Sequence, residues 1–309
     1  MKKNSVKIGT RGSQLALFQA GLTKAKLLEK FPEIEVEIVI IKTKGDKILD
    51  VALSKIGDKG LFTKEIENAL LAGEVDIAVH SLKDLPTTLP EGLKLGAVLE
   101  RGEFRDALVS KDGRKLHELT ENDVIATSSL RRKASLLRYN KNFHIVDIRG
   151  NVNTRLRKME EGYCDAMIMA AAGLHRLELD NYITEIIRPE IIIPAASQGI
   201  IAIESRVDDT ETEKLLNAIN HEPSWIAGEA ERGFLRAIEG GCQVPVGCFS
   251  KLIKEEITLT GFVASTDGSV YLLETEAGSV DQPKATGEKL ARKLIERGAA
   301  KIMEEVRNQ

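Results

Sequence analysis

A single cysteine stands in a segment whose neighbours restrict the backbone. Residues 239–247 read Glu-Gly-Gly-Cys-Gln-Val-Pro-Val-Gly, so Cys242 follows two glycines and precedes a proline by three residues. Because glycine permits backbone angles that other residues avoid and proline fixes its own, the segment predicts a tight loop that presents the sulfur at a set place. The alternative is a buried thiol beside a turn, since free cysteines are among the most buried residues.

Arginines are dense where predicted strands meet predicted helices. In an open α/β sheet, ligands bind beyond the carboxyl ends of the strands, where helix N-termini supply N–H donors for anions. Because a guanidinium matches a carboxylate with two parallel hydrogen bonds, these arginines favour a ligand with several carboxylates or phosphates. For each one alone, an ordinary surface ion pair is the alternative. The arginines in such positions are Arg11, Arg131, Arg132, Arg149 and Arg155.

One carboxylate is expected at the same edge. Asp84 comes just past an apolar strand, where it could stabilise a cationic centre or exchange a proton, or simply pair with an arginine. His80 lies inside that strand and is interpreted as a core histidine. Lys55 and Lys59 lie in the long segment 43–60, which is either a functional lid over an anionic ligand or a disordered excursion with solvated lysines.

Composition and motifs disfavour several classes of protein. Cys242 and Cys248 are six residues apart without a second pair or a histidine cluster, so no metal site is expected. The glycines form neither a dinucleotide fingerprint nor a P-loop, and no histidine stands in a context that suits a cysteine hydrolase. A net charge of −3 and an aromatic content of 4% argue against a nucleic-acid partner.

The chain is expected to be a cytoplasmic protein of two or three domains. Its 309 residues exceed one ordinary core, and no apolar run approaches the roughly 18 residues that span a bilayer. Its N-terminus leads straight into a strand without a signal region, so no membrane partner is expected. The three cysteines are sparse and odd in number, which argues against a disulfide framework and favours a reducing compartment.

An internal repeat positions the arginines and the carboxylate. The order strand, helix, strand, helix, Gly-x-x-Asp, strand occurs twice, with the glycine and aspartate at Gly73 and Asp76 and again at Gly162 and Asp165. We interpret this as two similar α/β domains that face each other, with a strand at 200–204 crossing back to the first. From residue 222 the pattern changes to a helix, three strands and a helix at 282–306, which indicates a small α+β domain.

Several separate motifs, in order along the whole chain, resemble the porphobilinogen deaminase (hydroxymethylbilane synthase) family. They are IGTRGSQLA at 8–16, VHSLKDLP at 79–86, TSSLRR at 127–132, IRGNVNTRL at 148–156 and the cysteine segment 239–247. The resemblance implies an α/β fold with two similar periplasmic-binding-protein-like (type 2) domains around a cleft. The resemblance also implies a third, C-terminal α+β domain with a three-stranded antiparallel sheet. The domains expected are 1–99 with 200–217, 105–193 and 222–309.

The resemblance also implies the chemistry. A dipyrromethane cofactor, one per chain, would be joined to Cys242 in thioether linkage. Four porphobilinogen units would be added to it with loss of ammonia, and hydrolysis would release the linear tetrapyrrole hydroxymethylbilane. A fixed carboxylate, Asp84, would stabilise the developing cation and contact pyrrole N–H groups. The family suggests a monomer.

Further residues receive roles by the same resemblance. The cofactor contacts implied are Ser13, Lys83, Asp84, Thr127, Ser129, Arg131, Arg132, Arg149 and Asn151. The substrate contacts implied are Arg11, Arg149, Arg155, Arg176 and Gln198, with Lys55 and Lys59 as lid candidates. The alternative function is a non-catalytic two-lobed protein that binds a polycarboxylate, which would leave the cysteine segment without a role. A nucleic-acid binder ranks third.

Overall fold

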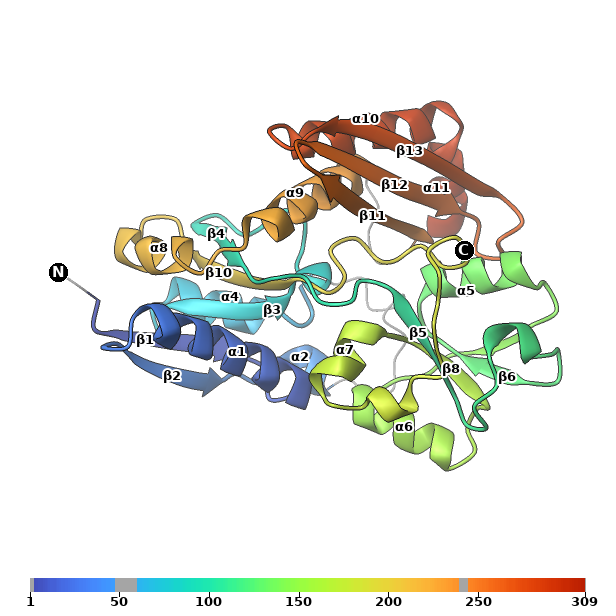
Figure 1. Cartoon of the computed structure of the whole chain (residues 1–309), viewed down its shortest axis with the longest axis horizontal. Coiled ribbons are helices and arrows are strands. Elements are labelled where there is room, and N and C mark those ends of the chain that lie inside the picture. The colour runs from blue at the N-terminus through green and yellow to red at the C-terminus, as the bar shows by residue number, and fades with distance from the viewer. Residues whose placement is uncertain (1–2, 48–59, 239–243, 309) are drawn as a thin grey trace. The chain divides into compact units, whose positions relative to one another are not determined.

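The computed structural model describes residues 3–47, 60–238 and 244–308. The chain divides into two compact units, residues 1–102 with 200–225 and residues 103–199 with 226–309 (Figure 1). The second unit contains both the middle and the C-terminal parts of the chain, so the three-domain boundaries expected from the sequence stay a prediction. None of the helices in the described ranges is long and apolar enough to cross a membrane.

The first unit is built on a five-stranded sheet of order β2-β1-β3-β10-β4. Its strands are β1 (Ser5–Thr10), β2 (Glu35–Ile40), β3 (Ile77–Ser81), β4 (Leu93–Val98) and β10 (Ile201–Arg206). β1 pairs in parallel with β2 and β3, whereas β10 is antiparallel to β3 and β4. The strand expected at 200–204 therefore does lie in the first sheet.

Helices cover both faces of this sheet. Its helices are α1 (Gln14–Lys30), α2 (Lys44–Lys47), α4 (Lys64–Leu71) and α8 (Thr210–Asn217), with a 3-10 turn at Leu82–Asp84. Ile77 of β3 packs in one buried cluster with Leu27 of α1 and Leu216 of α8. Ala78, the next residue, packs in another with Ile66 of α4. Successive strand residues thus point to opposite helical layers, which explains why the strand sequences are continuously apolar.

The second unit contains a sheet of matching plan, β7-β6-β8-β5-β9. Its strands are β5 (Asp106–Ser110), β6 (Val124–Ala126), β7 (His144–Val146), β8 (Ala166–Ala170) and β9 (Glu185–Ile186). The helices are α5 (Leu130–Tyr139), α6 (Val152–Glu160) and α7 (Ala171–Arg176), with 3-10 turns at Leu116–Glu118 and Asp180–Tyr182. As in the first sheet, three strands run parallel and the fourth, β5, is antiparallel to its neighbour β8.

The predicted internal repeat is confirmed at atomic detail. Gly73 and Gly162 both have positive φ, at 73° and 88°, where glycine is favoured because it lacks a Cβ. In each repeat the aspartate carboxylate accepts a hydrogen bond from a backbone N–H of a neighbouring parallel strand. Asp76 accepts from the Lys7 N–H of β1 at 2.7 Å. Asp165 does the same with the Val124 N–H at 2.8 Å. The Gly-x-x-Asp segment therefore ends a helix and fixes the start of a strand in both sheets.

The C-terminal part of the second unit is an antiparallel sheet with helices packed against it. It contains α9 (Glu222–Ala237) from residue 226 onward, β11 (Val246–Ile253), β12 (Glu256–Ala264), β13 (Tyr271–Ser279), α10 (Pro283–Glu296) and α11 (Ala299–Arg307). Phe234, Leu259 and Leu290 share its buried core. The single helix expected at 282–306 is wrong, because Gly298 adopts φ 101° and separates α10 from α11. The predicted α/β fold class with a three-stranded antiparallel sheet is confirmed.

Candidate functional site

A small pocket of about 70 Å³ lies in the first unit, at the carboxyl ends of β1 and β3. Arg11, Phe62, His80 and Asp84 are among its lining residues. The Arg11 guanidinium lies over the Phe62 ring, 4.3 Å from its centroid. Such stacking holds the guanidinium in place at the wall of the pocket.

The elements around this pocket follow from the local sequence. Ser13 caps α1 by accepting a hydrogen bond from the Ala16 N–H at 3.3 Å. The Gln19 side chain, buried on α1, donates to the Ser81 hydroxyl at 2.8 Å and ties the helix to the end of β3. These contacts place the N-terminus of α1 beside Arg11 and Ser13, as the sequence predicts.

Asp84 lies in the 3-10 turn that follows β3, with Lys83 beside it in the chain. Its side chain is exposed, whereas Leu82 and Leu85 on either side are buried and anchor the turn. Because the turn is anchored, the backbone that carries this carboxylate is already ordered before a ligand binds. The structure thus brings Arg11, Ser13 and Asp84 to one pocket.

In the second unit, Arg131 and Arg132 converge on a carboxylate that the sequence prediction missed. Asp106 lies 2.7 Å from the Nη1 of Arg131 and 2.7 Å from the Nη2 of Arg132. All three side chains are buried. Arg131 also donates to the carbonyl of Ile193 at 2.6 Å. Arg131 and Arg132 are therefore part of the packed interior of this unit, and their predicted cofactor contacts stay predictions.

Burial and charge act in opposite directions on this cluster. Burial opposes ionisation of Asp106, but the charges and hydrogen bonds of Arg131 and Arg132 outweigh it and hold the pKa of that carboxyl well below its usual range. Burial lowers the pKa of Arg131, and the Asp106 carboxylate partly offsets this. The Gln198 side chain also donates to Asp106, at 3.0 Å. Asp106 is thus an ionised, fully enclosed counter-ion.

Capped helix N-termini provide the donors in the second unit. Ser129 caps α5 by accepting from the Arg132 N–H at 3.5 Å, and the Thr127 hydroxyl accepts from the Ser129 N–H at 3.2 Å. Asn151 caps α6 by accepting from the Thr154 N–H at 2.9 Å. Each cap satisfies a backbone N–H at a helix start where the dipole favours an anion.

Arg149, at the junction before α6, can face an anionic ligand. Its guanidinium is half-buried, and no hydrogen bond or ion pair of that group occurs within the described residues. Its carbonyl accepts from the Lys158 Nζ at 3.2 Å, and the Nε of Arg155 donates to the carbonyl of Gly150 at 2.8 Å. Lys158 and Arg155 of α6 thus hold the backbone that carries Arg149.

Arg176 and Gln198 are both engaged within the second unit. Arg176 donates to the carbonyl of Gly199 at 2.6 Å, and burial lowers its pKa to about 10. Gln198 is buried and donates to the carbonyl of Phe104 at 2.8 Å as well as to Asp106. Within the described residues the partly buried Arg176 guanidinium makes this one hydrogen bond, and its other N–H groups suit a carboxylate ligand. The substrate contacts predicted for both residues stay predictions.

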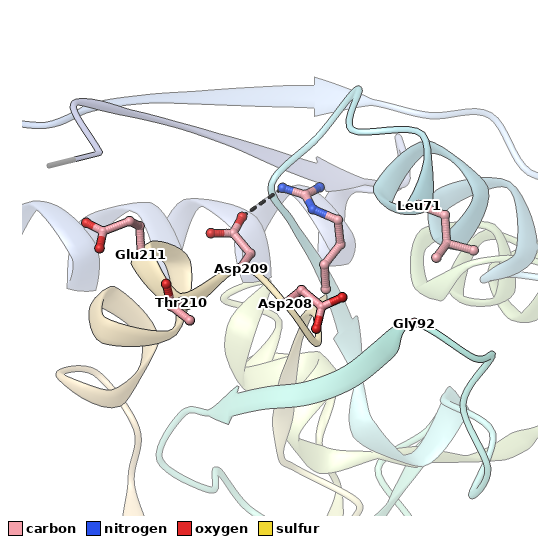
Figure 2. Close-up of a pocket in the computed structure, with 7 residues that line it drawn as sticks. Leu71, Gly92, Asp208, Asp209, Thr210 and Glu211 are labelled. Atoms are coloured by element: carbon pink, nitrogen blue, oxygen red, sulfur yellow. Dashed lines mark hydrogen bonds and ion pairs between the residues drawn. The ribbon is translucent and has the colours of Figure 1, made fainter. Parts of the chain in front are cut away.

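A larger pocket, of about 550 Å³, lies at the opposite edge of the first sheet (Figure 2). Arg206 lines it and pairs with Asp209 at 2.8 Å, while Asp208 and Glu211 contribute further negative charge. Asp209 also binds Lys3, which precedes β1, so the pocket lies at the amino ends of the parallel strands. Its acidic lining and its place in the fold make it unsuitable for a polycarboxylate.

Three predicted site residues lie outside the described residues: Cys242, Lys55 and Lys59. The described cysteines, Cys164 and Cys248, are both buried. Cys248 lies inside β11 with no exposed surface and is part of the packed interior. Burial raises the pKa of the Cys164 thiol to about 11, so this thiol is a poor nucleophile.

Comparison with known proteins covers nearly the whole chain. Residues 6–214 match the family model described as the porphobilinogen deaminase dipyromethane cofactor binding domain, and residues 225–296 match that of the porphobilinogen deaminase C-terminal domain. The porphobilinogen deaminase of Chlorobium luteolum is 47% identical over 99% of both chains. That of Syntrophomonas wolfei is 49% identical over 98% of this chain and 99% of its own.

Solved structures show a more distant likeness. The methionine-binding protein MetQ is 14% identical, with a TM-score of 0.43 over 72% of this chain and 92% of its own. An amino-acid transporter binding protein from Bacillus subtilis, YtmK, is 12% identical, with a TM-score of 0.41 over 70% of this chain and 90% of its own. These scores are too low to support a functional inference.

Proposed function

The chain belongs to the porphobilinogen deaminase family, and we propose that it joins four porphobilinogen units, with loss of ammonia, on a dipyrromethane primer in thioether linkage to Cys242. Hydrolysis then releases hydroxymethylbilane. The enzyme is thus a transferase of tetrapyrrole biosynthesis. The observation that carries this proposal is the near full-length identity to curated porphobilinogen deaminases, at 47% and 49%.

The residues present fit a dipyrromethane. Each of its pyrrole rings carries an acetate and a propionate, and the second unit offers capped helix N-termini at Ser129 and Asn151 together with the Arg149 guanidinium. These are the donors that carboxylates require. When bound, the cofactor supplies a nucleophilic pyrrole carbon and keeps the growing product attached to the protein.

Asp84 is the proposed catalytic residue. A carboxylate beside a pyrrole accepts hydrogen bonds from the ring N–H and stabilises the positive charge that develops as ammonia leaves porphobilinogen. Arg11 lines the same pocket, stacked over Phe62, and would bind a carboxylate of the substrate. Lys83 and Ser13 would bind carboxylates of the cofactor beside it.

The arginines of the second unit divide into two kinds. Arg131 and Arg132 already donate hydrogen bonds to Asp106. We therefore propose that they contact the cofactor only through their remaining N–H groups. Arg149, Arg155 and Arg176, with Gln198, would bind the carboxylates of incoming units and of the lengthening chain. The protein would act as a monomer in the cytoplasm, with porphobilinogen as its small-molecule substrate.

Intact-mass spectrometry tests this proposal. Purified protein should exceed the sequence mass by two pyrrole units and convert porphobilinogen to hydroxymethylbilane, and Cys242→Ser should lose both properties. Cys164→Ala is the matched control, because its buried thiol is inert, and it should keep the added mass. Fully active protein of unmodified mass would refute the attachment.

A further inference from the structure

A tight turn in the second unit has a backbone conformation that favours glycine. Residues 195–198 form the turn, which is closed by a hydrogen bond from the Gln198 N–H to the Ala195 carbonyl at 3.0 Å. Ser197, the third residue of the turn, has φ 63°. Glycine is the residue usually found at such a position, because a Cβ opposes this conformation. The turn therefore needs a contact that holds Ser197 in place.

A buried carboxyl group supplies this contact. Glu231 of α9 is fully buried, and its Oε2 accepts a hydrogen bond from the Ser197 N–H at 2.6 Å. Its Oε1 accepts from the N–H and from the hydroxyl of Ser250 on β11, at 2.9 Å and 2.7 Å. The Ser197 hydroxyl is buried and has no hydrogen-bond partner among the described residues. The backbone of Ser197, rather than its side chain, thus makes the contact that fixes the turn.

The residues that follow Ser197 belong to the proposed substrate contacts. The Gly199 carbonyl accepts from the Arg176 guanidinium at 2.6 Å. The Gln198 side chain donates to the Phe104 carbonyl at 2.8 Å. Because peptide units are planar and rigid, a change of φ at Ser197 would rotate the backbone that follows and displace both contacts. The conformation of Ser197 therefore sets the place of the carbonyl that orients Arg176.

We propose that Glu231 is a positioning residue for porphobilinogen binding, which holds Ser197 at positive φ and thereby orients Arg176. Gln198 is held by the same turn. This inference rests on the proposed function, in which Arg176 and Gln198 bind carboxylates of the incoming units. Glu231 acts on the substrate through the turn and does not contact it.

Glu231→Gln tests the inference through the KM for porphobilinogen. An amide has one acceptor oxygen where a carboxyl group has two, so it cannot accept from Ser197 and from the two donors of Ser250 together. The KM should rise about tenfold, with kcat within about twofold of the wild type, because a binding contact is weakened. Ser250→Ala is the matched control. It removes one hydrogen bond to the same carboxyl group, leaves the Ser197 contact in place and should keep the wild-type KM.

Ser197→Gly should rescue Glu231→Gln. Glycine adopts positive φ readily, so the double variant can form the turn without the carboxyl contact. Its KM should return to within about threefold of the wild-type value, and Ser197→Gly alone should keep the wild-type KM. If the double variant keeps the high KM of Glu231→Gln, or if Glu231→Gln itself keeps the wild-type KM, the inference is wrong.

A second pair of variants leaves Glu231 intact and covers the case in which Glu231→Gln does not fold. Ser197→Thr places a β-branched side chain at positive φ, which such side chains avoid, whereas Ser197→Ala removes only the hydroxyl. The KM should rise in the threonine variant and stay near the wild-type value in the alanine variant. Equal KM values in the two variants would overturn the inference.

Hydrogen exchange separates this inference from the proposed function. The Gln198 N–H closes the turn, so its exchange should be slow in the wild type and about tenfold faster in Glu231→Gln. Exchange should be slow again in the double variant with Ser197→Gly. This pattern does not depend on turnover, and unchanged protection in Glu231→Gln would refute the positioning role. Absence of hydroxymethylbilane formation by the wild type would instead refute the proposed function, whatever the exchange rates.

Discussion

The carboxylate of Asp106 lies 2.7 Å from the Arg131 guanidinium, with both side chains enclosed in the interior of the second unit. Arg132, the next residue on α5, pairs with the same carboxylate. One side chain from the start of β5 thus pairs with two cations from the start of α5. This pairing fixes the N-terminus of the helix at which a cofactor carboxylate is proposed to bind.

Acid should remove the stabilisation that Asp106 provides. Its pKa in the folded protein lies below the usual range, so its contribution is fully present above the unfolded value of about 3.9. That contribution is lost as pH falls through the folded value. The free energy of unfolding of the wild type, from urea titrations, should therefore fall more steeply below about pH 4 than that of Asp106→Asn.

The same substitution should be costly at neutral pH. Removing one partner from a buried ion pair leaves uncompensated charge, so Asp106→Asn should lower the free energy of unfolding by about 3–5 kcal/mol. Asp112→Asn is the control, because Asp112 pairs with Arg114 at the surface and its loss should change little. Equal stability of Asp106→Asn and the wild type would show that the cluster is not a stabilising ion pair.

Asp84→Ala should remove turnover and leave the fold intact. The side chain is exposed on an anchored turn, whereas a carboxylate that stabilises a developing cation contributes at least about a hundredfold to the rate. Circular dichroism would check the fold, and the rate of porphobilinogen consumption would check the loss. Asp208→Ala, at the larger acidic pocket, should keep wild-type turnover. The reverse pattern would place the reaction at that pocket.

Arg149→Ala should stall elongation. Loss of a charge-assisted contact to a substrate carboxylate should slow each addition about tenfold or more, so mass spectra should show protein with incomplete chains attached. Arg157→Ala is the control, since Arg157 lies on the neighbouring helix α6 and is 69% exposed beside Glu161. Similar chain-length distributions in the two variants would contradict a binding role for Arg149.

The sequence predicted those features that depend on local patterns. Apolar runs marked the strands, and the junctions predicted at Arg11, Arg131 and Arg149 do lie where helices begin, with Ser13, Ser129 and Asn151 as the caps. The repeated Gly-x-x-Asp segments, at residues 73–76 and 162–165, correctly predicted equivalent positions just before a strand in the two sheets. Such signals are readable because each is complete within a few residues of the chain.

Features formed by distant residues were missed. Asp106 is 25 residues from Arg131 and 92 from Gln198, and Glu204 reaches His80 only through the register of β10 on β3. His80 was therefore interpreted as a core histidine, without its partner. The break at Gly298 was missed for a different reason, since an isolated glycine within a helical pattern is often tolerated.

Gly150→Ala should destabilise the protein and impair elongation. Gly150 has φ 118°, and an added Cβ would lie 2.6 Å from the Cγ2 of Thr154, so both the backbone and the space oppose a side chain. Strain of this kind costs about 1–3 kcal/mol, and relief of it would displace Arg149 and the Asn151 cap on either side. Urea unfolding and the masses of bound intermediates would measure the two effects.

Gly21→Ala is the matched control for that substitution. Gly21 lies inside α1, and among the described residues no atom other than the adjoining backbone of α1 itself lies within 4 Å of the position its Cβ would occupy. Alanine there should raise the free energy of unfolding by about 0.4–1 kcal/mol, because it restricts the unfolded chain and favours the helix. If Gly150→Ala lowers the free energy of unfolding and Gly21→Ala raises it, the loss at Gly150 comes from the backbone conformation and close contact at that position. Equal small effects would show that the loop before α6 accommodates a side chain, and that its conformation does not position Arg149.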